Sequence, residues 1–243
     1  MKLYDSLAEW YPLFTRVEDY EEEAAWFTKH LQPGDGRPTL LEIGSGQGAN
    51  ALYMKRHFEI TLVEPAPPMR RLSEALNPEL EHLDGDMRTL RLDRQFDRVF
   101  IHDAIVYMTT REDLAAMFAT VDAHLSPGGI ALLAPDHLAD TFVPNWDDGG
   151  SDAPDGSGVR FIEHGYDPDP KDEQYTVDYA IMIHARDGSV RVEHDRHVEG
   201  LFSREVWLDA ARAAGFDATT KVFAHSDFEE GEIYEPIICR KPS

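Results

Sequence analysis

A glycine-rich turn is the first part of the chain whose residue types and spacing could do chemistry. It reads Leu41-Glu42-Ile43-Gly44-Ser45-Gly46-Gln47-Gly48, between an apolar run at 39–43 and a helical pattern at 47–57. In a strand–turn–helix setting, glycines let the backbone adopt positive φ and let a ligand approach the main chain closely. The turn therefore predicts a binding site for a nucleotide-like ligand.

The glycine spacing and the acid in front of the turn narrow the choice of ligand. A dinucleotide fingerprint has the pattern G-x-G-x-x-G, whereas Gly48 follows Gly46 after a single residue. Glu42 stands two residues before Gly44, where a carboxylate would repel a pyrophosphate but attract a ligand that carries an ammonium and a sulfonium. The pattern argues against an NAD-dependent oxidoreductase and favours a cationic cofactor.

Two further acids follow the second and third predicted strands. Glu64 comes twenty positions after the first glycine of the turn, an offset at which an acid can accept hydrogen bonds from both ribose hydroxyls. Asp86 stands in Gly85-Asp86-Met87, after the third strand. Open α/β sheets bind ligands at the carboxyl edge of their strands, so Glu42, Glu64 and Asp86 are expected to share one site.

Together these patterns resemble the motifs of the class I S-adenosylmethionine-dependent methyltransferases, and the resemblance covers most of the chain. Within that family the chain looks most similar to small-molecule members, including the amino-sugar N,N-dimethyltransferases. The residues that carry the resemblance are the glycine turn, Glu64-Pro65, Gly85-Asp86-Met87-Arg88, Leu125-Ser126-Pro127-Gly128-Gly129, Tyr4-Asp5 with Tyr11, and Asp195-x-His197 before Leu201-Phe202. The resemblance implies S-adenosyl-L-methionine as the cofactor.

The resemblance also implies which residues meet that cofactor. In the family, the acid of the third motif reaches the adenine amino group and the next residue covers the ring. An aromatic N-terminal segment closes over the cofactor in similar enzymes, although the same segment also suits an amphipathic helix packed on the core. The expected cofactor-binding residues are Tyr4, Tyr11, Glu42, Gly44, Ser45, Gly46, Gly48, Glu64, Pro65, Met69, Asp86, Met87 and His102.

His102 and Asp103 end the fourth predicted strand, which in the family faces the transferable methyl group. If the strand continues, the two side chains point to opposite faces, one toward the cofactor and one toward the acceptor. Alternatively, one of them caps the following turn. Methyl transfer mainly requires alignment and exclusion of water, and a base only where the acceptor must lose a proton. We expect His102, Asp103 and His197 to be catalytic, and His137 is a further candidate base.

Strand and helix alternate through the first 136 residues, which predicts a parallel sheet with right-handed crossovers. The expected fold is a Rossmann-like α/β domain, with a mostly parallel seven-stranded sheet, helices on both faces and a β-rich insertion after the fifth strand. Predicted helices span 18–31, 47–57, 68–76, 111–125 and 203–214; predicted strands span 39–43, 60–63, 80–83, 97–101, 130–134, 159–162, 175–185, 190–198, 218–224 and 233–239.

A single domain over 1–243 is expected. Its parts are an N-terminal lid and helix (1–31), a cofactor-binding half (39–136), a β-rich acceptor-side insertion (137–200) and a closing helix and strand pair (201–243). Residues 144–158 are rich in Gly, Asp and Ser and predict a loop or lid. Trp146, Tyr166 and Tyr179 in the insertion are expected to hold an acceptor amine through their ring faces and nearby acids.

Composition limits the partners. The net charge is −23, which disfavours nucleic acid. The end of the fourth strand also departs from the Asn-Pro-Pro-Tyr signature of nucleic-acid and glutamine N-methyltransferases, which argues against those substrates. A single cysteine, no signal sequence and no apolar run of membrane-spanning length predict a cytoplasmic protein without disulfides. No metal site is expected, and a homodimer is possible. The prediction is a methyltransferase for a small-molecule amine; the alternatives are an O-methyltransferase and a non-catalytic cofactor-binding module.

Overall fold

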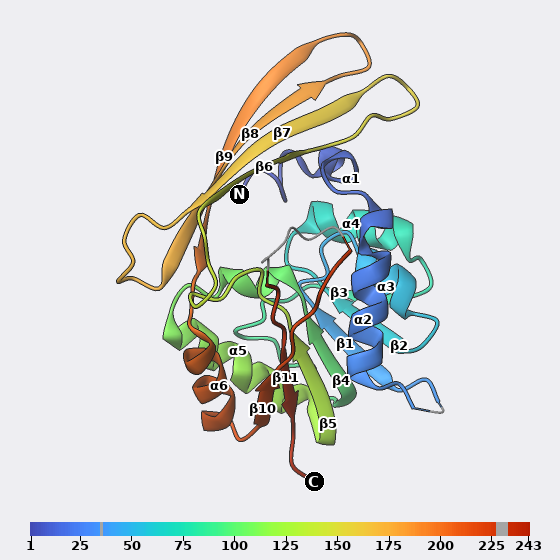
Figure 1. Ribbon diagram of the computed structural model, residues 1–243. Helices are drawn as coiled ribbons and strands as arrows, with labels where there is room; N and C mark the ends of the chain where they lie inside the picture. Colours follow the sequence, from blue (N-terminus) through green and yellow to red (C-terminus); the bar gives the residue numbers. More distant parts are fainter. Residues whose placement is uncertain (35, 227–232) are drawn as a thin grey trace.

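Two β-sheets build the molecule, one above the other in Figure 1. The larger is seven-stranded, with the order β10-β11-β5-β4-β1-β2-β3, and the smaller is four-stranded, with the order β6-β7-β8-β9. The structure is a computed structural model that describes residues 1–34, 36–226 and 233–243. Pairs among β1 to β5 are parallel, and β11 is antiparallel to both β5 and β10. The predicted fold class, including the β-rich insertion after the fifth strand, is confirmed.

The elements have these bounds. The seven-stranded sheet contains β1 (Thr39–Ile43), β2 (Glu59–Val63), β3 (Glu81–Leu83), β4 (Phe96–Ile101), β5 (Leu125–Leu133), β10 (Asp217–Thr220) and β11 (Ile237–Arg240), and the four-stranded sheet contains β6 (Asn145–Gly149), β7 (Gly158–Tyr166), β8 (Gln174–His184) and β9 (Val190–Gly200). The helices are η1 (Ala8–Trp10), α1 (Tyr11–Phe14), η2 (Val17–Tyr20), α2 (Glu21–Leu31), α3 (Ala49–Met54), α4 (Pro67–Leu76), η3 (Asp103–Tyr107), α5 (Arg111–His124) and α6 (Arg204–Ala213), where η marks a 3-10 helix.

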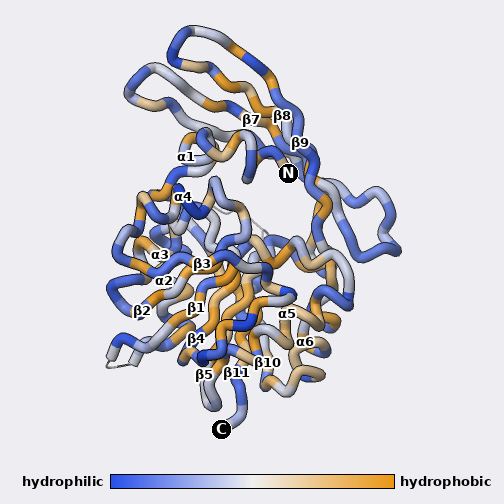
Figure 2. The backbone as a smooth tube through the Cα atoms, turned by 180° about the vertical axis from the view of Figure 1, so that it is seen from behind, coloured by the Kyte–Doolittle hydropathy of each residue, from blue (hydrophilic) through white to orange (hydrophobic). Residues whose placement is uncertain are grey.

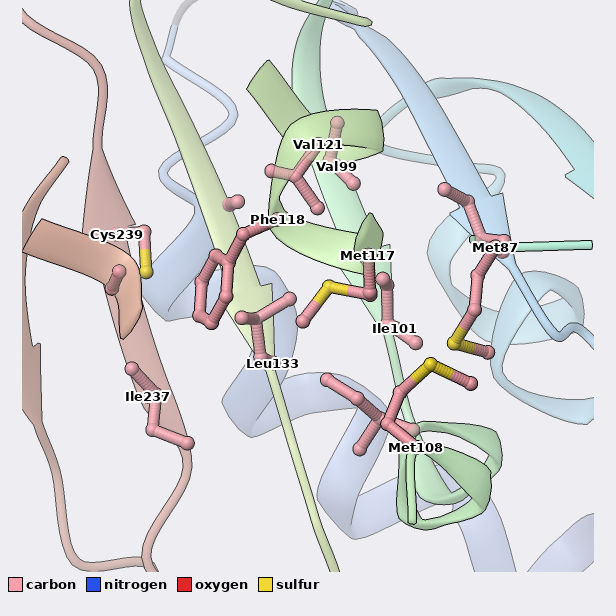
Figure 3. Close-up of a cluster of buried hydrophobic side chains, with 14 of the residues drawn as sticks. Met87, Val99, Ile101, Met108, Met117, Phe118, Val121, Leu133, Ile237 and Cys239 are labelled. Atoms are coloured by element: carbon pink, nitrogen blue, oxygen red, sulfur yellow. The ribbon is translucent and has the colours of Figure 1, made fainter. Parts of the chain in front are cut away.

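Both faces of the seven-stranded sheet are buried, which explains why its central strands are continuous apolar runs. Successive strand residues point to opposite faces. On one face, Ile101 and Leu133 pack against Met117 and Phe118 of α5, as Figure 3 shows. On the other face, side chains from α2 and α3 cover the sheet, and Phe27 is fully buried there. Figure 2 shows the hydrophobic residues concentrated along these strands.

The N-terminal segment lies between the two sheets (Figure 1). Leu3 and Leu7 are buried against the inner face of the four-stranded sheet, in a cluster that includes Ile181. Phe14 stacks on Phe161 of β7, with 3.8 Å between ring centroids. The N-terminal segment therefore fills one side of the region between the two sheets. Its buried side chains also belong to an apolar cluster.

The closing helix and turn follow the predicted pattern. Ser203 caps α6, because its hydroxyl accepts a hydrogen bond from the Val206 N–H at 3.3 Å. Gly215 stops the helix with φ of +91°, a conformation that favours glycine. Within the described residues, no helix is long and apolar enough to cross a bilayer.

Several predicted boundaries are wrong. Residues 144–158 are not all loop, because Asn145–Gly149 forms the edge strand β6 and pairs antiparallel with β7. An edge strand forms backbone hydrogen bonds with a neighbour on one side only, so it does not need a strand-like apolar sequence. The Gly- and Asp-rich sequence of β6 therefore does not indicate a strand. β7 itself runs on to Tyr166, well beyond the predicted 159–162. The helix expected from Glu18 begins at Glu21, because the 3-10 helix η2 precedes it, and the helix expected at 47–57 is limited to α3.

Candidate active site

A cavity of about 290 Å³ lies at the carboxyl edge of the parallel strands. The loops after β1, β2, β3 and β4 line it, together with the N-terminal segment. All of the residues predicted to bind the cofactor line this cavity except Gly48. The lining residues that the sequence-based prediction did not include are Met1, Tyr20, Ile43, Gln47, Ala49, Asn50, Ala66, Gly85, Arg88, Ala104, Tyr107 and Met108; Asp103, predicted as catalytic, also lines it.

The glycines of the turn have different roles. Gly46 has φ of +54°, and a Cβ at this position would meet only Met69 Cε, at 3.9 Å, so it would project into open space in the cavity. At Gly44, φ is +76° and a Cβ would collide with Ala104. Gly48 faces away from the cavity, where a Cβ would collide with the Ser73 and Asn77 side chains. The prediction that Gly48 contacts the cofactor is therefore not supported, because this glycine allows close packing of the turn against α4.

Buried acceptor atoms without partners surround the turn. Glu42 is 3% exposed, and its Oε2 has no hydrogen-bond partner among the described residues; the same holds for Ser45 Oγ and Asn50 Oδ1. Burial raises the pKa of Glu42 to about 8. Unpaired buried polar atoms cost free energy. These atoms fit a ligand that brings an ammonium group, as S-adenosylmethionine does.

Glu64 joins two loops of the cavity. Its carboxylate accepts hydrogen bonds from the Gly46 N–H at 2.9 Å and from the Ala66 N–H at 2.8 Å. Burial raises the pKa of this carboxyl, while the two backbone N–H groups act in the opposite direction. Each carboxylate oxygen keeps lone-pair capacity for a further donor. A ribose with two hydroxyl groups therefore fits this position.

Asp86 already has a partner on its own loop. Arg88 donates from Nε at 2.9 Å and from Nη2 at 2.5 Å, and its backbone N–H donates to Asp86 Oδ1 at 2.8 Å. The arginine holds the pKa of Asp86 below its usual range. Both side chains are partly exposed, so the pair can rearrange at low cost. Met87 lies beside this pair and is 8% exposed.

His102 and Asp103 do not alternate along a strand as expected, because β4 ends at Ile101 and η3 begins at Asp103. Instead they meet each other: His102 Nε2 lies 3.0 Å from Asp103 Oδ1 and 3.4 Å from Glu23 Oε2. Burial lowers the pKa of His102, but the two carboxylates outweigh burial and raise it well above its usual value. The two acids thus favour the protonated form of His102, although its Nε2 makes no hydrogen bond to either of them within the described residues.

Asp103, which lines the cavity, forms a carboxyl pair with Asp136, which does not. Asp136 follows β5, and its side chain is hydrogen-bonded to Asp103. Burial and the charge of Asp103 raise the pKa of Asp136, whereas for Asp103 His102 outweighs the effect of burial and lowers the pKa. The pair therefore shares one proton. The Asp103 side chain remains 48% accessible because it faces the cavity.

His197 lies in the four-stranded sheet, and its side chain is fully buried. Its Nε2 is 3.1 Å from Asp195 Oδ2, and its Nδ1 is 2.9 Å from Tyr107 Oη. Tyr107 Oη is in turn 3.0 Å from Tyr4 Oη. His197 does not line the cavity itself, whereas Tyr4 and Tyr107 do.

Strand alternation divides the aromatic residues of the insertion. Tyr179 is on the inner face, with its ring centroid 5.1 Å from that of His197. Trp146 and Tyr166 are on the outer face, where both stack on His164. Trp146 is 70% exposed. The expectation that all three hold the acceptor is therefore wrong for Trp146 and Tyr166, because their register places them on the side away from the cavity.

Some residues of the site were missed by sequence reasoning. Glu23 lies in the first turn of α2, where it accepts a hydrogen bond from Asn50 Nδ2 at 3.0 Å and pairs with His102. Asp136 and Tyr107 lie just after strands at the same sheet edge as the motif acids. That shared position is the signal that could have identified them.

Comparisons with known proteins agree with this geometry. Residues 40–129 match the family model of a methyltransferase domain. The chain is 28% identical over 162 residues to a dTDP-3-amino-3,4,6-trideoxy-alpha-D-glucopyranose N,N-dimethyltransferase of Streptomyces venezuelae, which covers 65% of this chain and 68% of that protein. It is 28% identical over 107 residues to a dTDP-4-amino-2,3,4,6-tetradeoxy-D-glucose N,N-dimethyltransferase of Saccharopolyspora spinosa, which covers 43% of each.

Solved structures share the fold over nearly the whole chain. The crystal structure of Streptomyces venezuelae DesVI superposes with a TM-score of 0.78 at 23% identity, over 97% of this chain and 98% of that one. The amino pentose methyltransferase CalS10 from Micromonospora echinaspora, solved with S-adenosylmethionine bound, gives a TM-score of 0.74 at 22% identity, over 91% of each chain. Residues 40–129 therefore form a methyltransferase domain, and the chain as a whole shares the fold of class I S-adenosylmethionine-dependent methyltransferases, which it resembles.

Proposed function

We propose that this methyltransferase transfers a methyl group to the amine nitrogen of a small molecule, with an amino sugar linked to a nucleotide as the acceptor class. The observation that carries the proposal is an acidic pair at the cavity. Asp103, which lines the cavity, forms this carboxyl pair with Asp136, and the charge of the buried Glu199 acts on Asp136. Among the described lining residues, Arg88 supplies the only Lys or Arg side chain, and it is paired with Asp86. The unneutralised carboxyl pair attracts the ammonium group of an acceptor.

The cofactor-binding roles follow the positions of the acids. We assign Glu42 to the cofactor ammonium, Glu64 to the ribose, and Asp86 with Met87 to the adenine. When bound, S-adenosylmethionine supplies a methyl group that is already activated as a sulfonium. The protein's part is then to align donor and acceptor and to exclude water. The wall formed by Tyr4 and Tyr11, which both line the cavity, serves that exclusion.

Of the three residues predicted to be catalytic, His102 and Asp103 line the cavity and His197 is buried outside its lining. Asp103 faces the cavity and is assigned to the acceptor amine. His102 fixes Asp103 through the contact at 3.0 Å, and its raised pKa makes it a charged partner rather than a base. His197 is too buried to touch the acceptor, so any effect of its imidazole must pass through Tyr107.

The sugar-nucleotide class is proposed from the relatives, whose printed names specify dTDP-linked amino sugars. The test is a methyl-transfer assay with S-adenosylmethionine and three acceptors: a dTDP-3-amino sugar, a dTDP-4-amino sugar, and the matched sugar with a hydroxyl in place of the amine. We expect mass spectrometry to detect N-methylated product from at least one amine and none from the hydroxyl sugar. Methylation of the hydroxyl analogue would overturn amine specificity. Binding of S-adenosylhomocysteine without turnover on any amine would instead support a non-catalytic binding module.

Two expectations about the chain's setting stay predictions. One is a homodimer, which size-exclusion chromatography with light scattering tests directly. The other is a cytoplasmic location, for which the single cysteine is an argument. The net charge of −23 argues against a nucleic-acid partner.

A further inference from the structure

Four side chains from three distant parts of the chain form a continuous line from the cavity into the four-stranded sheet. Tyr4 Oη and Tyr107 Oη are 3.0 Å apart, Tyr107 Oη and His197 Nδ1 are 2.9 Å apart, and His197 Nε2 and Asp195 Oδ2 are 3.1 Å apart. Asp195 Oδ2 also accepts a hydrogen bond from the Leu3 N–H at 2.9 Å, which ties the line to the N-terminal segment. Tyr4 and Tyr107 line the cavity, while His197 and Asp195 are buried behind them.

The carboxylate at the buried end determines where the protons lie. Asp195 can only accept, so a neutral His197 must place its proton on Nε2 and leave Nδ1 as an acceptor. With His197 neutral, Tyr107 would donate its hydroxyl hydrogen to Nδ1, and its oxygen would accept the hydroxyl hydrogen of Tyr4. In the structure the hydroxyl of Tyr107 is oriented the other way and donates to Tyr4 Oη. When His197 is protonated on both nitrogens, its Nδ1–H donates to Tyr107 and Tyr107 donates to Tyr4. The line of hydrogen bonds therefore has two consistent arrangements.

We propose that this line is a proton relay that removes the proton of the acceptor ammonium, with Tyr4 as the group that meets the acceptor and His197 as the final proton holder. The inference rests on the proposed function, because it needs an amine acceptor. The ammonium gives its proton to Tyr4 Oη, Tyr4 gives its hydroxyl proton to Tyr107 Oη, and Tyr107 gives its own to His197 Nδ1. The free amine lone pair then forms the new N–C bond as the C–S bond of the sulfonium breaks, and sulfur keeps that electron pair.

The other titratable groups near the acceptor are less suited to this task. Glu23 and Asp103 favour the protonated form of His102, and His102 lowers the pKa of Asp103, which makes that carboxylate a weak base. Burial raises the pKa of both Tyr4 and Tyr107 well above the usual value, so they pass protons on as neutral phenols and do not form phenolates.

The surroundings of His197 suit a group that becomes positively charged. The titratable groups that face it are Asp195 and Glu199 on its own strand, Tyr179 on β8, Glu163 on β7, Tyr107 on η3 and Tyr4 on the N-terminal segment. Glu199 Oε1 lies 3.7 Å from Nδ1, so an imidazolium would lie between two carboxylates. None of these partners within the described residues is a Lys or Arg side chain.

The relay predicts a specific pH signature. In Tyr4→Phe and Tyr107→Phe we expect kcat on a dTDP-amino sugar to fall about 10²-fold near pH 7, which is the lower range for general acid–base catalysis. We expect the loss to shrink above about pH 9, where more of an alkylamine is already neutral in water. Tyr166→Phe is the matched control, because it removes a hydroxyl bonded to Asp178 on the outer face of the same sheet. A loss that is equal at all pH values would overturn the relay and indicate a structural role.

A second measurement does not depend on finding the acceptor. Nitrogen-15 NMR of imidazole-labelled protein, at a pH where His197 is neutral, should show its proton on Nε2, and Tyr107→Phe should shift the Nδ1 resonance while Tyr166→Phe leaves it unchanged. A proton on Nδ1 in the neutral form would overturn the relay. If the NMR result holds but no amine is methylated, the proposed function fails while the hydrogen-bond line stands.

Discussion

The buried polar groups differ between two regions beside the cavity. We call the region around the glycine turn the floor, and the region formed by Tyr4, Tyr107 and the neighbouring residues of the four-stranded sheet the roof. On the floor, around the glycine turn, Glu42 Oε2, Ser45 Oγ and Asn50 Oδ1 have no partners among the described residues. In the roof, His197 and Asp195 of the four-stranded sheet are bonded to each other and continue to Tyr107 and Tyr4. Buried polar groups without protein partners indicate a surface where a ligand can supply the missing hydrogen bonds. Buried polar groups that are bonded to one another form a network that can affect a neighbouring group. The floor is therefore suited to cofactor binding and the roof to control of the acceptor.

The largest expected effect comes from filling the floor. In Gly46→Val the new side chain would occupy the cavity and the backbone would have to keep φ of +54°. We expect the affinity for S-adenosylhomocysteine, measured by calorimetry, to fall at least about 10²-fold, since both steric exclusion and strain of about 1–3 kcal/mol act together. Gly188→Val is the control, because Gly188 also has positive φ, at +84°, but no neighbour within 4 Å and no cavity. Equal affinity in a folded Gly46→Val protein would contradict the assignment.

A charge removed from the acceptor end should affect turnover and leave cofactor affinity nearly unchanged. For Asp103→Asn we expect kcat/KM for the amine to fall. The corresponding loss of transition-state stabilisation should be about 1.5–3 kcal/mol, the range for hydrogen bonds to charged groups. Asp209→Asn removes the same charge from the exposed face of α6 and serves as the control. If Asp103→Asn instead weakens S-adenosylhomocysteine binding as much as it slows turnover, the assignment of Asp103 to the acceptor is wrong.

Glu64 tests the ribose position. Glu64→Ala should weaken S-adenosylhomocysteine binding by roughly 1–3 kcal/mol, because it removes an acceptor for the ligand and leaves the Gly46 and Ala66 N–H groups unpaired. Glu64→Gln keeps one acceptor oxygen and should lose less. Thermal unfolding separates the loss of ligand contacts from damage to the turn. An unchanged dissociation constant in both variants would show that Glu64 does not bind the ligand.

Glu42 predicts a pH dependence of cofactor binding. Its pKa is about 8, so below that pH the carboxyl must lose a proton before it can pair with an ammonium. Affinity for S-adenosylhomocysteine should therefore rise with pH up to about 8, by at most tenfold per pH unit, and then level off. Without ligand the sign for stability is opposite: the folded state binds the extra proton, so rising pH destabilises it between about 4.5 and 8. Affinity that still rises in the same way in Glu42→Gln would assign the linkage to another group.

The smallest effect is expected on the outer face of the roof. Trp146→Ala should leave kcat/KM and cofactor affinity unchanged, because Trp146 stacks on His164 on the side away from the cavity. The inner-face substitution Tyr179→Phe is the comparison, since Tyr179 lies beside His197. A large loss of activity in Trp146→Ala would mean that the outer face belongs to the acceptor site.

The same comparison explains what the sequence could predict. The floor is local: the glycine turn, Glu64 and Asp86 follow consecutive strands, so strand order alone brings them to one edge. The roof depends on contacts between distant segments, because Tyr4 and Tyr107 are 103 positions apart and Tyr107 and His197 are 90 apart. The local sequence around Tyr4, Tyr107 and His197 does not indicate that these residues come into contact. The inner or outer placement of Trp146 depended on strand register, which a Gly- and Asp-rich edge strand does not reveal.

The most direct test of the whole account is a crystal structure with S-adenosylhomocysteine and a dTDP-amino sugar bound together. We predict that the cofactor product lies along the floor, with its ammonium at Glu42 and its ribose at Glu64. The acceptor nitrogen should face the sulfur from the roof side, within hydrogen-bond distance of Tyr4 Oη or the Asp103 carboxylate. An acceptor bound on the outer face of the four-stranded sheet, or with its nitrogen turned away from Tyr4 and Asp103, would contradict the account.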